Sequence, residues 1–393
     1  MPNDPIIRSL TVRNLLSFGE ESITVALQNL NVLIGPNGSG KSNLIEVFGL
    51  LQSAPKELAT AISNGGPIDE WLWKGASKSP VASIEAMVRP AKGAMDLRYR
   101  LAFTKAGFRF EITDELIECE RPQPGKPKPY FFYSYENGRA MLNFKGEERD
   151  LRREDVNPQL SILAQRKDPE HYPEITYLGE LFAKFCLYRD WEFGTVAEVR
   201  NPCDASLQSA YLEEDGSNLG VVLDRFLSRP PVKQQILDSL RTFYENTRDL
   251  RTTIEGGKVQ TRLEENHLKA TVPLIRMSDG TIRWLALLAI LLNPDPPPLV
   301  CIEEPELGLH PDMIHELSKL LIEASTRMQL IITTHSERLV EEFSDLPEAV
   351  LVCEKAEGSS SFHRLSAPQL ASWLKQYTLG ELWNKGQIGG TRW

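Results

Sequence analysis

One stretch of the sequence has the residue types that hold the phosphates of a nucleotide. The segment GPNGSGKS, Gly35 to Ser42, fits the pattern G-x-x-x-x-G-K-[ST] in full. Its glycines let backbone N–H groups curl around phosphate oxygens, and the helix start that follows adds partial positive charge. We expect Lys41 to reach the β- and γ-phosphates and the Ser42 hydroxyl to bind Mg²⁺. The predicted ATP-binding residues of this loop are Gly35, Pro36, Asn37, Gly38, Ser39, Gly40, Lys41, Ser42 and Asn43.

A second motif places two carboxylates at the end of an apolar strand. In LVCIEEPELGLHP these are Glu303 and Glu304. Successive side chains along a strand point to opposite faces, so the two carboxylates have different roles. We expect Glu303 to face the Mg²⁺ shell and Glu304 to face the γ-phosphate, where it orients the attacking water. The alternative is an acidic strand end that caps a helix, which the phosphate-binding loop makes the minority interpretation.

A histidine follows another apolar strand in LIITTHSERL. His335 stands at the C-terminal end of that strand, the side on which open α/β sheets bind ligands. A lone histidine is usually structural, but this position favours a contact with the γ-phosphate or the attacking water. His310 and His315 are five residues apart rather than four, so we predict no metal site there.

A polar turn, Ser278-Asp279-Gly280, stands directly before the apolar run IRWLALLAILL. Such a helix start can be a simple cap or can bind an anion, and the two uses share one geometry. Lys41 and Glu303 are 262 positions apart. This long separation favours anion binding, because ATPases with an ABC-type head have such an insertion. In these heads the turn grips the γ-phosphate of a second copy's ATP across a two-fold interface.

The elements that position these motifs follow from local patterns. The phosphate-binding loop lies between a buried strand at 30–35 and a helix at 41–51. Strands and helices alternate again near the end, with strands expected at 298–302, 328–334 and 349–354. Alternation at both ends of the chain predicts a partly parallel α/β core. We therefore predict an α/β P-loop NTPase with an ABC-type head.

The remaining residues predict an antiparallel lobe and an insertion. Alternating strands are expected at 6–13 and 22–27, in a meander over 82–119 and again over 249–275. Helices are expected within 174–191, 216–228 and 231–246, whereas 130–170 is polar and gives no clear pattern. The predicted domains are an N-terminal lobe at 1–120, an insertion at 121–248 and a C-terminal lobe at 249–393.

Composition excludes several classes of protein. The 393 residues are 41% hydrophobic with a net charge of −10, and no apolar run is long enough to span a bilayer. The N-terminus lacks a signal-peptide core, so we expect a cytoplasmic protein. Five scattered cysteines form neither a disulfide framework nor a zinc pattern. A loose basic group is interpreted as a solvated surface rather than a DNA-binding strip: Arg121, Lys126, Lys128, Arg152, Arg153 and Arg166.

Two further segments have two interpretations each. The loop GGPIDEWLWKG, 65–75, contains two tryptophans, for which burial against the sheet is favoured over a contact at the nucleotide edge. The C-terminal LWNKGQIGGTRW is apolar for a tail, so it either packs back on the head or docks a partner.

The motifs together resemble a known group of proteins. VRNLLSFGE, GPNGSGKSNL, MSDGT, EEPELGLHP and TTHS are similar to motifs of the bacterial ATPases grouped with RecF, SMC-type heads and the OLD (overcoming lysogenisation defect) nucleases. The resemblance covers roughly 1–120 and 250–393, and the ending resembles stand-alone ATPases of this group. It implies ATP-driven dimerisation, with roles in DNA transactions or in phage defence beside a Toprim-type nuclease.

The sequence also departs from these relatives. OLD proteins carry a Toprim nuclease after the head, whereas this sequence ends at Trp393, so any nuclease is expected to be a separate partner. No sustained heptads predict an SMC-like coiled coil. The Q-loop glutamine of transporter ATPases is not evident, and Gln52 is interpreted as structural. Glu303 stands where transporters use Asp, and Asp279 where they have Gly.

The first hypothesis is therefore a Mg²⁺-dependent ATPase that forms a homodimer or higher oligomer through ATP. Its state is expected to control a separate effector, such as a nuclease in antiviral defence. One alternative is an ATP-dependent assembly switch that does not hydrolyse ATP. Another is a RecF- or SMC-like repair ATPase that binds DNA directly. A transporter motor is disfavoured, because the Q-loop is missing, and no membrane partner is expected.

Overall fold

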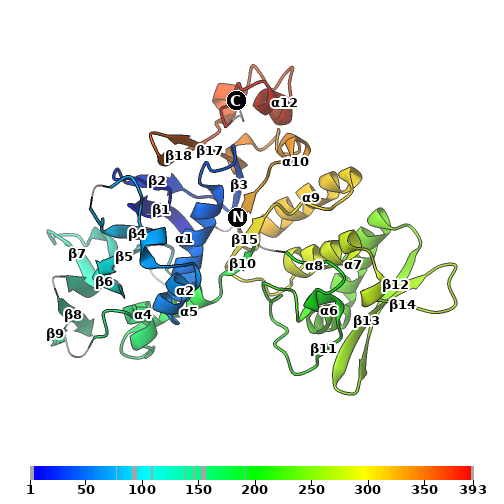
Figure 1. Ribbon diagram of the computed structural model, residues 1–393, viewed down its shortest axis with the longest axis horizontal. Helices are drawn as coiled ribbons and strands as arrows, with labels where there is room; N and C mark the ends of the chain where they lie inside the picture. Colours follow the sequence, from blue (N-terminus) through cyan, green and yellow to red (C-terminus); the bar gives the residue numbers. More distant parts are fainter. Residues whose placement is uncertain are drawn as a thin grey trace. The chain divides into compact units, whose positions relative to one another are not determined.

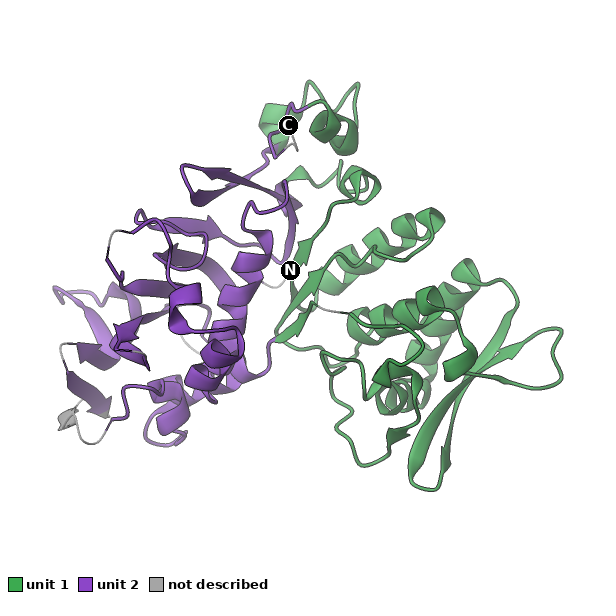
Figure 2. Cartoon of the chain, viewed as in Figure 1, with its two compact units in different colours: residues 1–3, 186–347, 367–385 green, residues 4–185, 348–366, 386–393 purple. Residues whose placement is uncertain are grey.

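The computed structural model describes residues 4–390 except 77, 91–94, 108, 137, 145–146, 152–155 and 190. Arg152 and Arg153 of the predicted basic group therefore lie outside the described residues. The chain divides into two compact units, each built from segments that are distant in sequence (Figure 2). The P-loop unit comprises 4–185, 348–366 and 386–393, and the carboxylate unit comprises 186–347, 367–385 and the first three residues.

An antiparallel sheet of eight strands forms much of the P-loop unit (Figure 1), in the order β2-β1-β4-β5-β6-β7-β8-β9. Along β4 buried and half-buried residues alternate, as the period-two pattern predicts. The predicted meander over 82–119 is confirmed, and it continues through three more strands between residues 129 and 151 that the sequence analysis left unassigned. The strands are β1 (Ile7–Arg13), β2 (Ile23–Ala26), β4 (Ala82–Val88), β5 (Leu97–Ala106), β6 (Arg109–Pro122), β7 (Pro129–Glu136), β8 (Arg139–Phe144) and β9 (Glu147–Leu151).

A second set of strands in this unit carries the phosphate-binding loop. β3 (Leu30–Ile34) is buried along its whole length and pairs in parallel with β17 (Val350–Ala356). β18 (Ser359–Arg364) pairs antiparallel to β17 and was not predicted. The loop after β3 leads into α1 (Lys41–Ser53), where Gln52 donates a hydrogen bond to the Phe185 carbonyl at 2.8 Å. The other helices here are α2 (Leu58–Asn64), α3 (Ile68–Trp71), α4 (Ile162–Gln165) and α5 (Pro173–Ala183).

Three parallel strands form the core of the carboxylate unit, in the order β10-β15-β16. The strands predicted at 298–302 and 328–334 are confirmed as β15 (Leu299–Glu303) and β16 (Gln329–Thr333). β10 (Cys186–Tyr188) has only three residues and was not predicted. Its residues Cys186 to Tyr188 pair with Val300 to Ile302, so β10 ends beside the carboxylate end of β15.

A second, antiparallel sheet of the carboxylate unit packs against two helices. Its order is β11-β13-β12. β11 pairs with the start of β13, and β14 pairs with β13 further along, at Arg262 and Leu263. These strands lie at β11 (Cys203–Asp204), β12 (Thr247–Glu255), β13 (Lys258–Glu265) and β14 (Val272–Pro273). The helices against it, α6 (Leu219–Leu227) and α7 (Pro230–Phe243), confirm the two that the sequence predicts.

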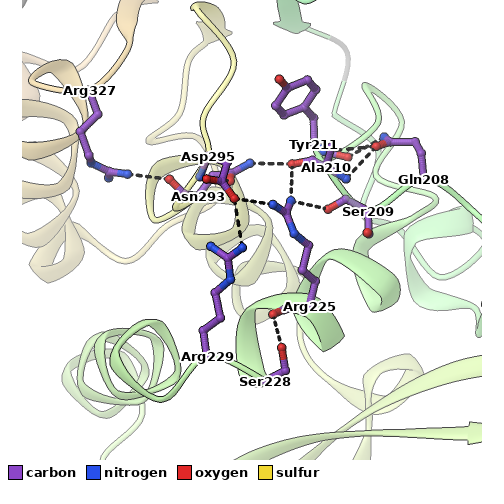
Figure 3. Close-up of polar contacts among 10 residues, drawn as sticks. All are labelled: Gln208, Ser209, Ala210, Tyr211, Arg225, Ser228, Arg229, Asn293, Asp295 and Arg327. Atoms are coloured by element: carbon purple, nitrogen blue, oxygen red, sulfur yellow. Dashed lines mark hydrogen bonds and ion pairs between the residues drawn. The ribbon is translucent and has the colours of Figure 1, made fainter.

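Helix α8 (Asp279–Leu291) is the most buried helix of this unit, with ten consecutive buried residues from Ile282 to Leu291. Its C-terminal end is fixed by polar contacts (Figure 3). Arg327 donates to the carbonyls of Leu291 and Asn293 at 2.7 and 2.6 Å, and the Asn293 amide donates to the Ala210 carbonyl. Two residues further on, Asp295 accepts from Arg225 and Arg229 at 2.6 and 3.1 Å.

The last helices complete the unit. α9 (Ile314–Ser325) follows β15, and α10 (Glu337–Glu341) follows β16. Two short helices, α11 (Ala367–Leu370) and α12 (Leu379–Asn384), lie near the C-terminal end of the sequence. α12 contacts α10, and its Leu379 and Leu382 are buried. The apolar C-terminal segment therefore packs back on its own chain through α12. Among the described residues, 3₁₀ turns form at Glu198–Arg200, Leu274–Arg276 and Pro311–Met313 in this unit, and at Pro347–Ala349 where the chain passes to the P-loop unit.

Among the described residues, no helix has both the length and the apolar composition to cross a bilayer. The lobes at 1–120, 121–248 and 249–393 follow the order of the sequence, whereas the two compact units combine distant segments. The three lobes remain our proposal for how the chain is organised.

Candidate active site

The phosphate-binding loop has a backbone that only glycine allows at two positions. Gly35 has a φ of 147°, and a Cβ atom there would lie 2.2 Å from the Cys353 carbonyl oxygen. Gly40, directly before α1, has a φ of 109°, and its Cβ would lie 2.3 Å from the Ser360 hydroxyl. β17 and β18 therefore press closely against this loop, which explains why the pattern needs glycine here.

Lys41 folds back across the loop. Its ammonium group donates hydrogen bonds to the carbonyls of Gly35 and Pro36 at 2.8 and 3.1 Å, and the residue is 6% exposed. A buried positive charge is thus held at the concave side of the loop. Ser39 is buried and its hydroxyl has no hydrogen-bond partner among the described residues, whereas Ser42 and the loop tip at Asn37 and Gly38 are exposed.

A pocket of about 410 Å³ adjoins the first turn of α1. Asn43 lines it together with Leu16, Trp73 and Lys355. Trp73 is half-buried and donates its indole N–H to the Gly358 carbonyl at 3.2 Å. Trp71, in contrast, is buried and donates to the Ile62 carbonyl. Burial, the favoured interpretation for both tryptophans, holds for Trp71, whereas Trp73 lines a pocket beside the phosphate-binding loop.

Glu303 ends β15 beside Thr333, the last residue of β16. One of its carboxylate oxygens is buried and has no hydrogen-bond partner within the described structure. The nearest cation is the guanidinium of Arg189, whose Nε lies 3.6 Å from that oxygen. A buried carboxylate oxygen without a hydrogen bond suits a hard cation, since Mg²⁺ prefers oxygen ligands.

Glu304 has an uncommon backbone conformation. Its φ is 45°, in the left-handed region that non-glycine residues rarely adopt. The surrounding backbone holds it there: its N–H donates to the Thr333 carbonyl at 3.0 Å, and its carbonyl accepts from the Leu307 N–H at 3.0 Å. Its side chain is 39% exposed. Strained residues that their surroundings fix in place are common at catalytic sites.

His335 lies close to Glu304. Its Nε2 is 3.9 Å from a carboxylate oxygen of Glu304, and its side chain is only 20% exposed. The two side chains come from the ends of the neighbouring parallel strands β15 and β16. The structure thus brings together Glu303, Glu304 and His335, three of the residues predicted from sequence.

Glu306 is a third acidic residue of this cluster that the sequence analysis did not single out. It accepts hydrogen bonds from the Thr334 hydroxyl at 2.5 Å and from the His335 N–H at 3.3 Å. Burial is the main cause that raises the pKa of its carboxyl group. Glu306 therefore ties the segment after β15 to the histidine turn. Its only sequence signal is its place three residues after Glu303 in the same motif.

The Ser278-Asp279-Gly280 turn forms the N-terminus of α8. The Ser278 hydroxyl accepts a hydrogen bond from the Thr281 N–H at 3.2 Å, which makes Ser278 the N-cap. A Cβ at Gly280 would lie 3.1 Å from the Gly308 carbonyl, in the segment after the paired carboxylates. Ser278 and Asp279 are exposed, so the helix start is open to a ligand.

The residues predicted from sequence divide between the two units. Gly35 to Asn43 belong to the P-loop unit, and Ser278 to Gly280, Glu303, Glu304 and His335 belong to the carboxylate unit. In the part of the chain that the structure describes, no three His, Cys, Asp or Glu side chains form a metal-binding group. A Mg²⁺ ion held mainly by phosphate oxygens needs few protein ligands, and Ser42 and Glu303 are oxygen donors of the right kind.

The fold and these motifs define a P-loop NTPase with an ABC-type ATPase head. Within this class, residues 30–341 match the model of the family described as "AAA domain, putative AbiEii toxin, Type IV TA system". The chain belongs to this family. None of the curated proteins matches the sequence.

Solved structures of SMC heads share the fold. An SMC head bound to the C-terminal winged-helix domain of ScpA has 13% identity and a TM-score of 0.59, and the match covers 93% of this chain and 99% of that one. An SMC head with an extended coiled coil from Pyrococcus furiosus has 13% identity and a TM-score of 0.54, with 95% and 99% covered. One from Pyrococcus yayanosii has 12% identity and a TM-score of 0.50, with 95% and 99% covered. The predicted resemblance to SMC-type heads is confirmed for the fold.

Proposed function

We propose that this protein is a Mg²⁺-dependent ATPase whose hydrolysis depends on Glu304. The observation that carries the proposal is the fixed, half-exposed Glu304 carboxylate with His335 at 3.9 Å and the more buried Glu303 beside it in sequence. Gly35 to Ser42 bind the triphosphate, and Lys41 reaches its β- and γ-phosphates. Glu304 orients a water that attacks the γ-phosphorus, the bond to the bridging oxygen breaks, and ADP and phosphate leave.

The other residues of the site have supporting roles. His335 contacts the γ-phosphate or the attacking water, and its closeness to Glu304 supports this role. Ser42 and Glu303 would hold Mg²⁺, which neutralises negative charge on the phosphates when it is bound. Ser42 is exposed, and the Glu303 oxygen 3.6 Å from Arg189 Nε accepts no hydrogen bond from the described residues, which leaves it able to accept one from a metal-bound water.

Two copies share each ATP in this proposal. The Ser278 hydroxyl and the backbone N–H groups of Asp279 and Gly280 grip the γ-phosphate of ATP bound to the phosphate-binding loop of a second copy, through the open N-terminus of α8. ATP therefore joins two chains into a homodimer, and its hydrolysis releases them. The exposure of this turn and its serine cap support the proposal.

Substitution of Glu304 tests the hydrolytic role. We expect Glu304→Gln to lower phosphate release by at least about 100-fold, since it removes the group that orients water. ATP binding should persist, and an ATP-bound dimer should accumulate. Phosphate release and light scattering measure the two effects, with exposed Glu323→Gln as the matched control. Equal turnover of Glu304→Gln and the unaltered protein would exclude this role, and absence of turnover in both would favour an ATP-dependent assembly switch.

We propose further that the ATP-bound dimer controls a separate effector protein in the cytoplasm. The family description names a type IV toxin–antitoxin system, which supports a separate protein partner. The resemblance to defence ATPases supports a Toprim-type nuclease as that partner. Co-expression with the product of the neighbouring reading frame, followed by ATP-dependent co-purification, tests this. DNA binding by the isolated protein that ATP stimulates and salt weakens would favour the RecF-like alternative instead.

A further inference from the structure

Arg200 is a buried arginine that holds the N-terminal turn of α8. It is 5% exposed and belongs to the 3₁₀ turn Glu198–Arg200, far from α8 in sequence. Its Nε donates to the carbonyl of Phe193 at 2.7 Å, and Nη1 donates to the carbonyl of Met277 at 2.8 Å. Its Nη2 pairs with the carboxylate of Asp279. One guanidinium group thus binds both the residue before Ser278 and the residue after it.

The pairing with Arg200 offsets the negative charge of Asp279 at the proposed phosphate site. Asp279 is 66% exposed on the first turn of the helix whose start is proposed to receive a phosphate. An unpaired carboxylate there would repel the triphosphate, because like charges a few ångströms apart interact unfavourably. Arg200 neutralises this charge from the buried side. The hydrogen bond to the Met277 carbonyl also holds the peptide group that joins Met277 to Ser278, directly before the start of α8.

The segment that carries Arg200 is also connected to the backbone of Glu304. Trp191 and Phe193 place their rings against the guanidinium of Arg283 in α8, with both ring centres 5.4 Å from it. Arg283 donates in turn to the Glu304 carbonyl at 3.4 Å. The segment 191–200 therefore joins the start of α8 to the backbone of Glu304 through buried cations.

We infer that Arg200 is a positioning residue that prepares the Ser278 turn to bind the γ-phosphate of ATP held by a second copy. The inference rests on the proposed shared ATP site. It differs from a purely structural role in one respect: loss of Arg200 should damage the site of the partner copy and leave the phosphate-binding loop of its own chain intact.

Mixing two inactive variants tests this difference. Lys41→Ala lacks nucleotide binding, and Arg200→Met lacks the positioned turn, so each alone should turn over at less than roughly a tenth of the normal rate. In a mixed dimer, the loop of the Arg200→Met chain meets the intact turn of the Lys41→Ala chain. An equimolar mixture should recover roughly a quarter of normal turnover, since half of the dimers are mixed and each has one complete site. No recovery would overturn the inference.

A parallel mixture separates this inference from the proposed function. Ser278→Glu places a negative charge in the turn itself and should also be rescued by Lys41→Ala. Rescue of Ser278→Glu without rescue of Arg200→Met would leave the shared site standing and reject the role of Arg200. Failure of both mixtures would reject the shared site.

Arg225 provides a matched control at the other end of α8 (Figure 3). It contacts the Ser209 and Ala210 carbonyls and the Asp295 carboxylate, a set similar to that of Arg200. Arg225→Met should lower the Tm, though by less than Arg200→Met because the Arg225 side chain is 25% rather than 5% exposed, and should change turnover by less than roughly twofold. A loss of turnover in Arg225→Met as large as that in Arg200→Met would indicate a general effect of destabilisation and overturn the inference.

Removal of the Asp279 charge tests whether Arg200 acts by neutralising that carboxylate. Asp279→Asn, added to Arg200→Met, should raise turnover at least roughly fivefold over Arg200→Met alone, because no unpaired carboxylate then faces the phosphate. An equally inactive double variant would reject neutralisation as the role of Arg200. Arg200→Lys keeps the positive charge and can replace Arg200→Met in the mixing experiment if the methionine variant does not fold. Its loss should be smaller and should also be rescued by Lys41→Ala.

Discussion

At the scale of single residues, backbone strain occurs in both compact units. Only four described non-glycine residues have a positive φ: Asn14, Leu16, Glu304 and Glu357. Leu16 and Glu357 line the pocket beside α1, and Glu304 is the proposed catalytic carboxylate. Such conformations cost about 1–3 kcal/mol each and persist where the surrounding contacts determine them. The strain therefore marks positions whose side chains or carbonyls are held in fixed directions.

Two glycines of the phosphate-binding loop lead to a prediction about stability. Both Gly38 and Gly40 have positive φ, but a Cβ at Gly38 meets no atom within 4 Å, whereas one at Gly40 would strike the Ser360 hydroxyl. Gly38→Ala should cost about 1–2 kcal/mol of unfolding free energy from backbone strain alone. Gly40→Ala should cost a further ~1–3 kcal/mol from the clash. Urea unfolding without nucleotide measures both, and equal losses would contradict the role of Ser360.

The sequence identifies part of the site at this scale, and the reason is local. Glu303, Glu304 and His335 end apolar strands, and the glycines and Lys41 follow a contiguous motif, so each can be found from its neighbours. Arg200 carries no such signal, because its partners Met277 and Asp279 are distant in sequence. Arg189 is similar: only the pairing of β10 with β15 places it beside Glu303.

At the scale of elements, strands with a strongly apolar or alternating sequence can be predicted, whereas short or polar strands cannot. The run PLVCI and the alternation in ASIEAMV predict β15 and β4 directly. β10 has three residues after a helix, too few to show a period. β8 and β9 contain charged residues on a sheet extension, where hydrophobic alternation is weak. β18 contains three consecutive serines and is a strand because it pairs with β17.

Glu115 joins three elements of the P-loop unit and leads to a prediction about pH. This buried carboxyl group on β6 accepts hydrogen bonds from Tyr99 on β5, from Ser161 before α4 and from the Ile162 N–H. Burial raises its pKa from 4.5 to about 7, although these hydrogen bonds oppose the shift. Between these two pH values the folded chain retains a proton that the unfolded chain has lost. The Glu115 carboxyl group therefore makes the free energy of unfolding fall as the pH rises through this window.

Glu115→Gln should remove that part of the pH dependence, because glutamine does not titrate. The difference in unfolding free energy between the unaltered protein and the variant should change by roughly 1.4 kcal/mol per pH unit across the window, and stay constant above it. Urea unfolding from about pH 4.5 to pH 8 measures it, with exposed Glu136→Gln on β7 as the control. An identical pH slope in Glu115→Gln and the unaltered protein would show that Glu115 is not held protonated.

At the scale of the whole molecule, each compact unit combines segments that are separated in the sequence. The P-loop unit takes β17 and β18 from after residue 347, and the carboxylate unit begins again at residue 367. The spacing of the motifs indicates a long insertion, but local patterns cannot show which segments join in space, because that depends on strand pairing. β3 with β17 is the clearest case, with more than 300 residues between the paired strands.

A shared ATP site makes a final prediction for the assembled protein, because turnover then requires an encounter of two chains. ATP hydrolysis per chain should rise with protein concentration and level off once most chains are dimeric, as mass action requires. The Ser278→Glu variant should reach its full hydrolysis rate only at a higher protein concentration, or stay slow at every concentration. The reason is that its negative charge repels the γ-phosphate of ATP bound to the second copy. Steady-state phosphate release over a wide dilution series, with sedimentation in ATP and in ADP, measures both quantities. A nucleotide-bound protein that stays monomeric, hydrolyses at a rate per chain that does not depend on concentration, and tolerates Ser278→Glu would show that one copy is sufficient.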